Sequence, residues 1–172
     1  MLIQFLGAAG EVTGSKHLIT TDSGKTILLD CGMYQGKGME TDAANKELGF
    51  DPKDIHYLLL SHAHIDHSGL IPRLVRQGFN GPIYCTSATI DLCRIMLMDS
   101  AYIQEKDLQR VNERRRRQNR EELELLYGVD DVQKTLELMQ PIQYNQPFFL
   151  NDGEVEASFT DTGHILGSAA IQ

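Results

Sequence analysis

The chain has 172 residues, of which 41% are hydrophobic, and this suits one domain or one large piece of a domain with a sizeable core. No apolar run approaches the length of a membrane span, and the first ten residues lack the basic and apolar regions of a signal peptide, so no membrane association is expected. The formal net charge of −8 argues mildly against a general nucleic-acid clamp, but it leaves room for an enzyme that grips a phosphate through metal ions.

The N-terminal part is predicted to be antiparallel β-structure. Residues 2–7 (LIQFLG) form a short apolar strand, and a Gly-rich loop follows it. Residues 16–21 and 26–30 then flank the turn DSGK as a hairpin. The stretch from residue 33 to residue 51 has little periodicity and is expected to be an exposed loop.

Strands and helices alternate in the middle of the chain. Residues 55–60 (IHYLLL) are predicted to be a buried strand, residues 68–78 a helix that stops at Gly78, and residues 81–86 another strand. Ser87 is a candidate N-cap for the next helix. The pattern from about residue 99 to residue 139 is helical and highly charged, and Asp130 is a candidate cap within it. Strands at 146–150 and 154–162 around the turn NDG close the chain. The pattern predicts an α+β fold, or a mixed sheet with helices on one face.

The three cysteines, Cys31, Cys85 and Cys93, are widely spaced and form no CxxC pair. An odd number at such spacing argues against a disulfide framework and favours a reducing compartment. We therefore expect a cytoplasmic protein whose cysteines are small buried hydrophobic residues.

The stretch SHAHIDHSGL, directly after the buried strand, concentrates residues that bind metals. His62, His64, Asp66 and His67 fall within six positions, and the chain has only six histidines. Neutral imidazole and carboxylate groups are suitable zinc ligands, and a loop after a strand can point them around one cavity. A single histidine there would more often be an ordinary polar residue, but this density predicts a metal site. Two metal ions about 3.5–4 Å apart could stabilise both oxygens of an in-line displacement at phosphorus.

The spacing HxHxDH resembles the signature of the metallo-β-lactamase superfamily. Asp30 at the end of TILLDCG is similar to the family's first motif, and His164 in TDTGHILGSA to its third. The phrases FLGAAGEVTGSKHL, LLDCGMYQG, HSGLIPRL and GHILGSAA resemble the β-CASP branch in particular. Its members are RNA-processing nucleases related to the cleavage and polyadenylation endonuclease.

The resemblance implies a role for each matching residue. His62, His64 and His164 would hold the first metal ion, and Asp66 and His67 the second. The two ions would be zinc, with manganese as an alternative. Asp30 would orient the ligand loop from outside the coordination sphere, as such partners do. Asp66 and Asp30 are the candidate catalytic residues, and a hydroxide between the metals would attack an RNA phosphodiester.

The family's next elements are an aspartate that bridges the metals and an inserted β-CASP domain with the remaining metal-binding histidine. The chain stops at Gln172, eight residues after His164. We therefore expect residues 1–172 to be the N-terminal portion of a metallo-β-lactamase domain, mainly the first half of its αββα sandwich. The rest of that domain and the β-CASP domain would be absent. An incomplete sheet would expose an apolar edge, which makes a homo-oligomer plausible.

Three functions remain open from the sequence. The first is a metal-dependent hydrolase that cleaves RNA in the full-length parent protein. The second is another hydrolase on the same scaffold, acting on a thioester or a lactam, since one fold hosts many chemistries. The third is a non-catalytic metal-binding or assembly fragment.

Two further segments are weaker candidates. The Gly-rich loop does not fit a phosphate-binding P-loop, because Ser15 separates its last glycine from Lys16. Its Glu11 and Thr13 could approach substrate. The arginines at 114–117 and 120 could contact RNA phosphates. However, opposite charges four residues apart favour a solvated helix face instead. These pairs are Glu113 with Arg117, Arg117 with Glu121, and Arg120 with Glu124.

Overall fold

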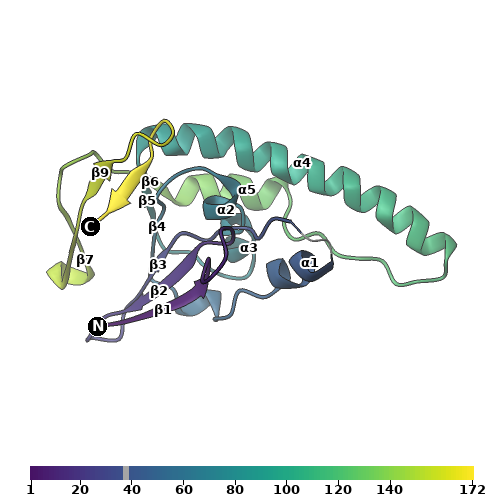
Figure 1. The fold of residues 1–172 in the computed structure, drawn as a ribbon, viewed down its shortest axis with the longest axis horizontal. Helices are drawn as coiled ribbons and strands as arrows, with labels where there is room; N and C mark the ends of the chain where they lie inside the picture. The colour runs from purple at the N-terminus through teal and green to yellow at the C-terminus, as the bar shows by residue number, and fades with distance from the viewer. Residues whose placement is uncertain (37–38) are drawn as a thin grey trace.

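A six-stranded sheet forms the centre of the protein in the computed structural model, which describes residues 1–36 and 39–172 (Figure 1). Its strands lie in the order β1 (Leu2–Gly7), β2 (Lys16–Thr20), β3 (Thr26–Leu29), β4 (Tyr57–Leu59), β5 (Ile83–Cys85) and β6 (Met139–Pro141). The first three strands pair antiparallel, and β3 to β6 pair parallel. The sheet is therefore mixed, as the sequence predicted.

The helices lie together on one side of this sheet (Figure 1). They are α1 (Met39–Lys46), α2 (Ile65–Ser68), α3 (Ile71–Arg76), α4 (Ser87–Arg117) and α5 (Val129–Leu138), with a short 3₁₀ helix at Pro52–Asp54. The long helix α4 packs on α5 near its beginning and then projects past the rest of the molecule (Figure 1). No helix among the described residues is long and apolar enough to cross a membrane.

Four short strands form a second β layer on the other side of the large sheet (Figure 1). They are β7 (Phe148–Leu150), β8 (Val155–Ala157), β9 (Phe159–Asp161) and β10 (Ala169–Ile171), and they form two antiparallel pairs. Phe148 joins the layers, since its ring centroid lies 5.2 Å from that of Tyr84 in β5. The layers confirm the predicted α+β class, although the single strand expected at 154–162 is divided into β8 and β9.

The core fills the space between the large sheet and the helices. Leu28, Leu58 and Ile83 are adjacent in the strand register and fully buried. Parallel strands covered on both faces require such apolar runs. The cysteines are buried and free, as predicted. At the β1 edge, by contrast, Ile3 and Phe5 remain 49% and 68% exposed.

The prediction of an exposed loop over residues 33–51 was wrong for α1, although Lys37 and Gly38 of that stretch lie outside the described residues. The segment has no apolar periodicity, and α1 is held instead by a tertiary contact. The side-chain amide of the buried Asn45 accepts the backbone N–H of Tyr34 and donates to its carbonyl. Helix formation here depends on a partner eleven residues away.

Helix boundaries differ from the predicted ones by a few residues. The helix expected at 68–78 is the shorter α3, with Pro72 in its first turn, while Ile65–Ser68, expected to lie mainly in a loop, form the separate helix α2. Thr86 rather than Ser87 caps α4, because its hydroxyl accepts the N–H of Thr89. At the start of α5, Asp131 rather than Asp130 accepts a backbone N–H, that of Gly128.

Candidate metal centre

The candidate centre lies where β3 and β4 end side by side. Because parallel strands bring their carboxyl ends to one edge of a sheet, Asp30 after β3 meets Ser61 after β4. The backbone N–H of Asp30 donates to Leu59 at 3.0 Å, and Asp30 has a positive φ of 56°. This turn directs the Asp30 carboxylate towards the loop that contains the three neighbouring histidines.

The buried carboxylate of Asp30 determines which ring nitrogen carries the proton in two of the imidazoles. It accepts the N–H and the hydroxyl of Ser61, each at 2.8 Å, and the Nδ1–H of His67 at 2.7 Å. Since the Ser61 hydroxyl donates to Asp30, it must accept from His62 Nδ1, which lies 2.9 Å away. Both rings therefore carry their proton on Nδ1 and leave the Nε2 lone pair free.

Three imidazole nitrogens converge on one point in front of this network. His64 Nδ1 lies 3.1 Å from His62 Nε2 and 3.2 Å from His164 Nε2, and all three atoms fit within 4.8 Å. Ligand atoms about 2.05 Å from a tetrahedral zinc ion are about 3.3 Å apart. Two of the three separations match this value and the third is at most 4.8 Å, so the three histidines can hold one tetrahedral metal ion.

Asp66 and His67 form a second pair beside this triad. His67 Nε2 lies 3.7 Å from a carboxylate oxygen of Asp66, and the His67 and His62 rings have centroids 4.0 Å apart. The side chains of Asp66 and His67 are 22% and 25% exposed, so solvent can reach them. The structure thus brings together all six residues that the sequence singled out, including Asp30 and His164 from distant segments.

Burial and neighbouring charges affect the protonation of these histidines. Burial, followed by the positive charge of His67, lowers the pKa of His62 to about 4, so its ring is neutral at neutral pH. Burial also disfavours charge on His67. The hydrogen bond to Asp30 and the charges of Asp30 and Asp66 outweigh that burial and raise the pKa of His67. A metal ion can bind only the neutral imidazole, so it must compete with a proton at His67.

The loop that carries His164 is fixed to the beginning of α4, an attachment for which the sequence has no local signal. The hydroxyls of Thr86 and Thr89 both donate to the carbonyl of Gly167, at 2.7 and 2.9 Å. A Cβ on Gly167 would lie 2.6 Å from the Thr89 nitrogen, so the loop approaches the helix as closely as glycine allows. Ser168 completes the loop by accepting the N–H of His164.

The Gly-rich loop lies along the rim of the site. Ser15 donates its N–H to the carbonyl of Asp66, and Thr13 bonds to the backbone of Gln35. A hollow of about 580 Å³ lies here, lined in part by Glu11, Thr13 and Tyr34.

Lys16 is buried next to this rim, a position with no signal in the sequence. Its ammonium donates to the Gly32 carbonyl at 3.2 Å and lies 4.3 Å from the centre of the Tyr34 ring. Cys31 beside it is no candidate nucleophile, because burial raises the pKa of its thiol to about 12.

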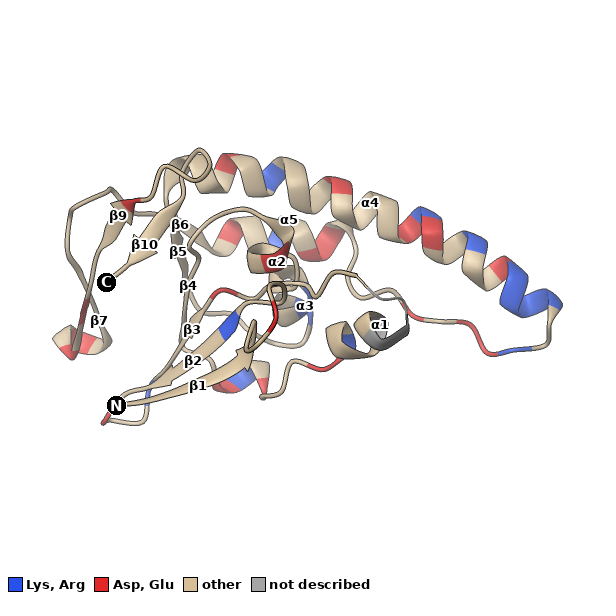
Figure 2. Cartoon of the chain, viewed as in Figure 1, with Lys and Arg blue, Asp and Glu red and all other residues tan. Residues whose placement is uncertain are grey.

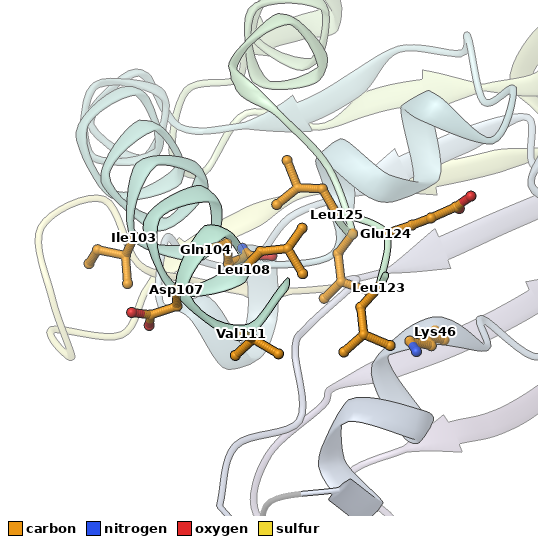
Figure 3. Close-up of a pocket in the computed structure, with 10 residues that line it drawn as sticks. Lys46, Ile103, Gln104, Asp107, Leu108, Val111, Leu123, Glu124 and Leu125 are labelled. Carbon is orange, nitrogen blue, oxygen red and sulfur yellow. The ribbon is translucent and has the colours of Figure 1, made fainter. Parts of the chain in front are cut away.

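The hollow between α4 and the segment that follows it lies away from this chemistry (Figure 3). Its volume is about 280 Å³, and Leu108 of α4 points across it towards Leu123 and Leu125, while Ile103 and Val111 also line it. None of the candidate metal ligands lines it.

Comparisons with known proteins agree with the metal-binding geometry of the site. The family described as the metallo-beta-lactamase superfamily matches residues 10–139. A ribonuclease of Thermus thermophilus is 38% identical over 171 residues, which make up 99% of this chain and 34% of that protein. Subunit 3-I of the cleavage and polyadenylation specificity factor of Arabidopsis thaliana is 28% identical, over 98% of this chain and 22% of that protein.

Solved structures share the fold. A mutant metallo-beta-lactamase of Cronobacter sakazakii superposes with a TM-score of 0.59 at 20% identity, over 98% of this chain and 54% of that one. The chain therefore spans about half of this structural neighbour and about a third or less of the two curated relatives. The resemblance to the superfamily and to its RNA-processing members is confirmed.

Proposed function

The chain belongs to the metallo-beta-lactamase superfamily, and from this premise we propose that it is the metal-binding portion of a ribonuclease that hydrolyses RNA phosphodiester bonds. The observation that carries the proposal is the convergence of three imidazole nitrogens within 4.8 Å of one another, beside an aspartate and a fourth histidine. The names of the curated relatives, a ribonuclease and a cleavage factor subunit, support RNA as the substrate.

We assign the first metal to His62, His64 and His164, and the second to Asp66 and His67. Zinc is the proposed ion because the donors are mainly imidazoles, and manganese is the alternative. The bound metal would polarise a phosphoryl oxygen and lower the pKa of a water molecule towards about 7.

The protein's own residues then have distinct tasks. Asp30 places the proton of the neutral rings on Nδ1, directly in His67 and through Ser61 in His62, and so each neutral ring presents its Nε2 lone pair to a metal. Asp66 would be a metal ligand, and its half-buried carboxylate is also placed to orient the attacking water. We also propose that residues 1–172 are the N-terminal portion of the metallo-beta-lactamase domain, and that the protein works in the cytoplasm.

The test combines metal content with cleavage of a 5′-labelled RNA. We expect bound zinc, RNA cleavage, and loss of both in His64→Ala. A matched His17→Gln variant, outside the cluster on β2, should retain both.

Metal binding without cleavage of RNA would contradict activity of this chain and favour the non-catalytic alternative. Hydrolysis of a chromogenic lactam or of a thioester, with RNA left intact, would favour the other hydrolases.

A further inference from the structure

The end of α4 concentrates positive charge in a protein that is otherwise acidic. Six of the nine arginines fall between positions 110 and 120, a stretch whose only acidic residue is Glu113. We call this group the arginine tip; it consists of Arg110, Arg114, Arg115, Arg116, Arg117 and Arg120. Figure 2 shows it at the far end of the projecting helix, away from the sheet.

Ion pairs within the described part of the protein neutralise only some of these arginines. The three pairs that the sequence suggested are not among the ion pairs of the described residues. Two of those pairs could not form in helical geometry, because α4 ends at Arg117. Within the described part of the tip, Arg116 pairs with Glu122, and Arg110 lies 3.7 Å from the exposed Asp107.

Two arginines of the tip have a structural task. Arg115 donates to the backbone carbonyl of Glu121, and Arg116 donates to the side chain of Glu122. Together with the buried Asn112, which bonds both backbone groups of Leu123, they fasten the segment that leaves the helix. The remaining arginines are exposed and are not needed for that purpose.

Three of the exposed arginines share one concave surface, which Arg117 does not line. Arg110, Arg114 and Arg120 line a hollow of about 430 Å³ together with Val111, Arg115 and Gln118. Positive side chains three or four residues apart on a helix repel one another, as Arg110 and Arg114 do. A helix C-terminus attracts cations, but its effect is confined to the last turn, and Arg110 lies before that turn. A bound polyanion would relieve the repulsion.

We propose that the arginine tip binds the phosphate backbone of RNA, as a second contact surface separate from the metal centre. Guanidinium groups match phosphate oxygens with two parallel hydrogen bonds. Apolar residues on the same turns would be needed for a membrane-binding helix, and Val111 is the only one between 110 and 120. The choice of RNA among polyanions rests on the proposed function.

The position of the tip indicates how long the bound RNA must be. Thr89 contacts the loop of His164, and Arg114 lies 25 residues farther along the same helix. At a rise of about 1.5 Å per residue, these points are about 38 Å apart. A strand stacked as in a duplex advances about 3.4 Å per nucleotide and would need on the order of eleven nucleotides to span this distance.

The experiment compares two triple variants of equal charge change. The tip variant loses three exposed charges of the arginine tip through the substitutions Arg114→Gln, Arg117→Gln and Arg120→Gln. The control variant loses the same amount of charge at exposed positions elsewhere, through Lys53→Gln, Arg94→Gln and Lys134→Gln. Binding of a labelled RNA of about 30 nucleotides is measured by anisotropy in EDTA, so that cleavage does not contribute. Thermal unfolding checks that both variants fold.

Three lost phosphate contacts should reduce the slope of log K against log salt by about 2. Raising the salt concentration from about 50 to about 200 mM should then lower the RNA affinity of the wild type about 15-fold more than that of the tip variant. The control variant should behave like the wild type. Equal slopes in the two variants, or wild-type binding by the tip variant, would overturn the proposal. The proposal would also be overturned if the tip variant lost binding to phosphatidylserine vesicles while its RNA binding was unchanged, because a lipid surface would then be the ligand.

Cleavage provides a second, separate comparison. Compared with the wild type, the tip variant should have a higher KM for the long RNA and the same kcat. Its hydrolysis of bis(p-nitrophenyl) phosphate should be unchanged. A reduced kcat on both substrates would contradict a role in RNA binding. If neither substrate is cleaved by the wild type, the proposed function fails, while the salt dependence of binding still decides the role of the tip.

Discussion

At the residue scale, the Asp30 carboxylate controls which nitrogen atoms face the metal centre. It is 6% exposed and accepts three hydrogen bonds of 2.8 Å or less from Ser61 and His67. A carboxylate can only accept, so the direction of each bond is fixed. The ring orientation of His62 and His67 therefore depends on a residue that is not one of the proposed metal ligands.

Replacement of Asp30 by Asn tests this dependence. An amide NH₂ placed at Oδ2 would donate to His67 Nδ1 and move the ring proton to Nε2, where the metal must bind. We expect metal affinity to fall about 10- to 100-fold while the fold is retained. Competition with a chromophoric chelator measures the affinity, and imidazole ¹⁵N shifts report the tautomer. Unchanged affinity with an unchanged tautomer would show that Asp30 does not orient these rings.

A second test at the same scale concerns Thr89, whose side chain is fully buried and donates to the Gly167 carbonyl. Thr89→Val keeps the shape but removes the hydroxyl, so it should lower the free energy of unfolding by about 1 kcal/mol. It should also weaken metal binding about ten-fold, because the loop of His164 loses one of its two supports. Thr89→Ser, which keeps the hydroxyl, should restore the affinity. Equal weakening in both variants would mean that packing, not the hydrogen bond, positions the loop.

At the scale of elements, the loop after β3 and the start of α2 touch at Gly32. A Cβ there would lie 1.6 Å from the carbonyl oxygen of Asp66 and 2.2 Å from its carbon. These are backbone atoms, so the contact cannot be relieved by turning a side chain. The closeness of the two segments lets Asp30 and His67 form their hydrogen bond.

Gly32→Ala should therefore separate the two segments. We expect a loss of about 1–3 kcal/mol in the free energy of unfolding, with a larger relative loss of metal affinity. Gly128→Ala is the control, since its Cβ would meet nothing closer than 3.7 Å. Denaturant titration and metal competition give the two quantities. Gly32→Ala with wild-type metal affinity would contradict the required contact.

Local signals explain which elements could be predicted from the sequence. The strands β3 (Thr26–Leu29) and β4 (Tyr57–Leu59) show as apolar runs, and the ligand cluster fits within six positions. By contrast, Asn45 supports α1 through Tyr34, and Thr89 holds Gly167 across 78 positions. Neither pair has a local pattern, because its partners meet only after folding. Asp30 and His164 were found through the family resemblance and not through any periodicity.

At the scale of the whole molecule, Glu154 joins the two β layers. Its carboxylate accepts the hydroxyl and the backbone N–H of Ser23 in the hairpin turn, and also bonds with Thr21 and Asn151. These bonds, those of Ser23 foremost, lower the pKa of Glu154 to about 2 from an ordinary value of 4.5. They tie the β2–β3 turn to the turn between β7 and β8.

The stability that Glu154 adds should depend on pH. Because its pKa is lower in the folded chain, the contribution is complete above about pH 4.5 and declines as the pH falls to about 2. The difference in melting temperature between the wild type and Glu154→Gln should shrink over that interval. The wild type is the more stable protein at pH 7. A difference that stays constant from pH 7 to pH 2 would contradict the role of the ionised carboxylate.

The most direct test of the central claim is X-ray absorption at the zinc edge of the metal-loaded protein. The geometry of His62, His64 and His164 predicts imidazole nitrogens at about 2.0–2.1 Å from the ion, with no sulfur ligand. In His164→Ala the number of imidazole ligands at the first metal should fall from three to two. A sulfur shell at about 2.3 Å, or an unchanged spectrum in His164→Ala, would contradict the proposed centre.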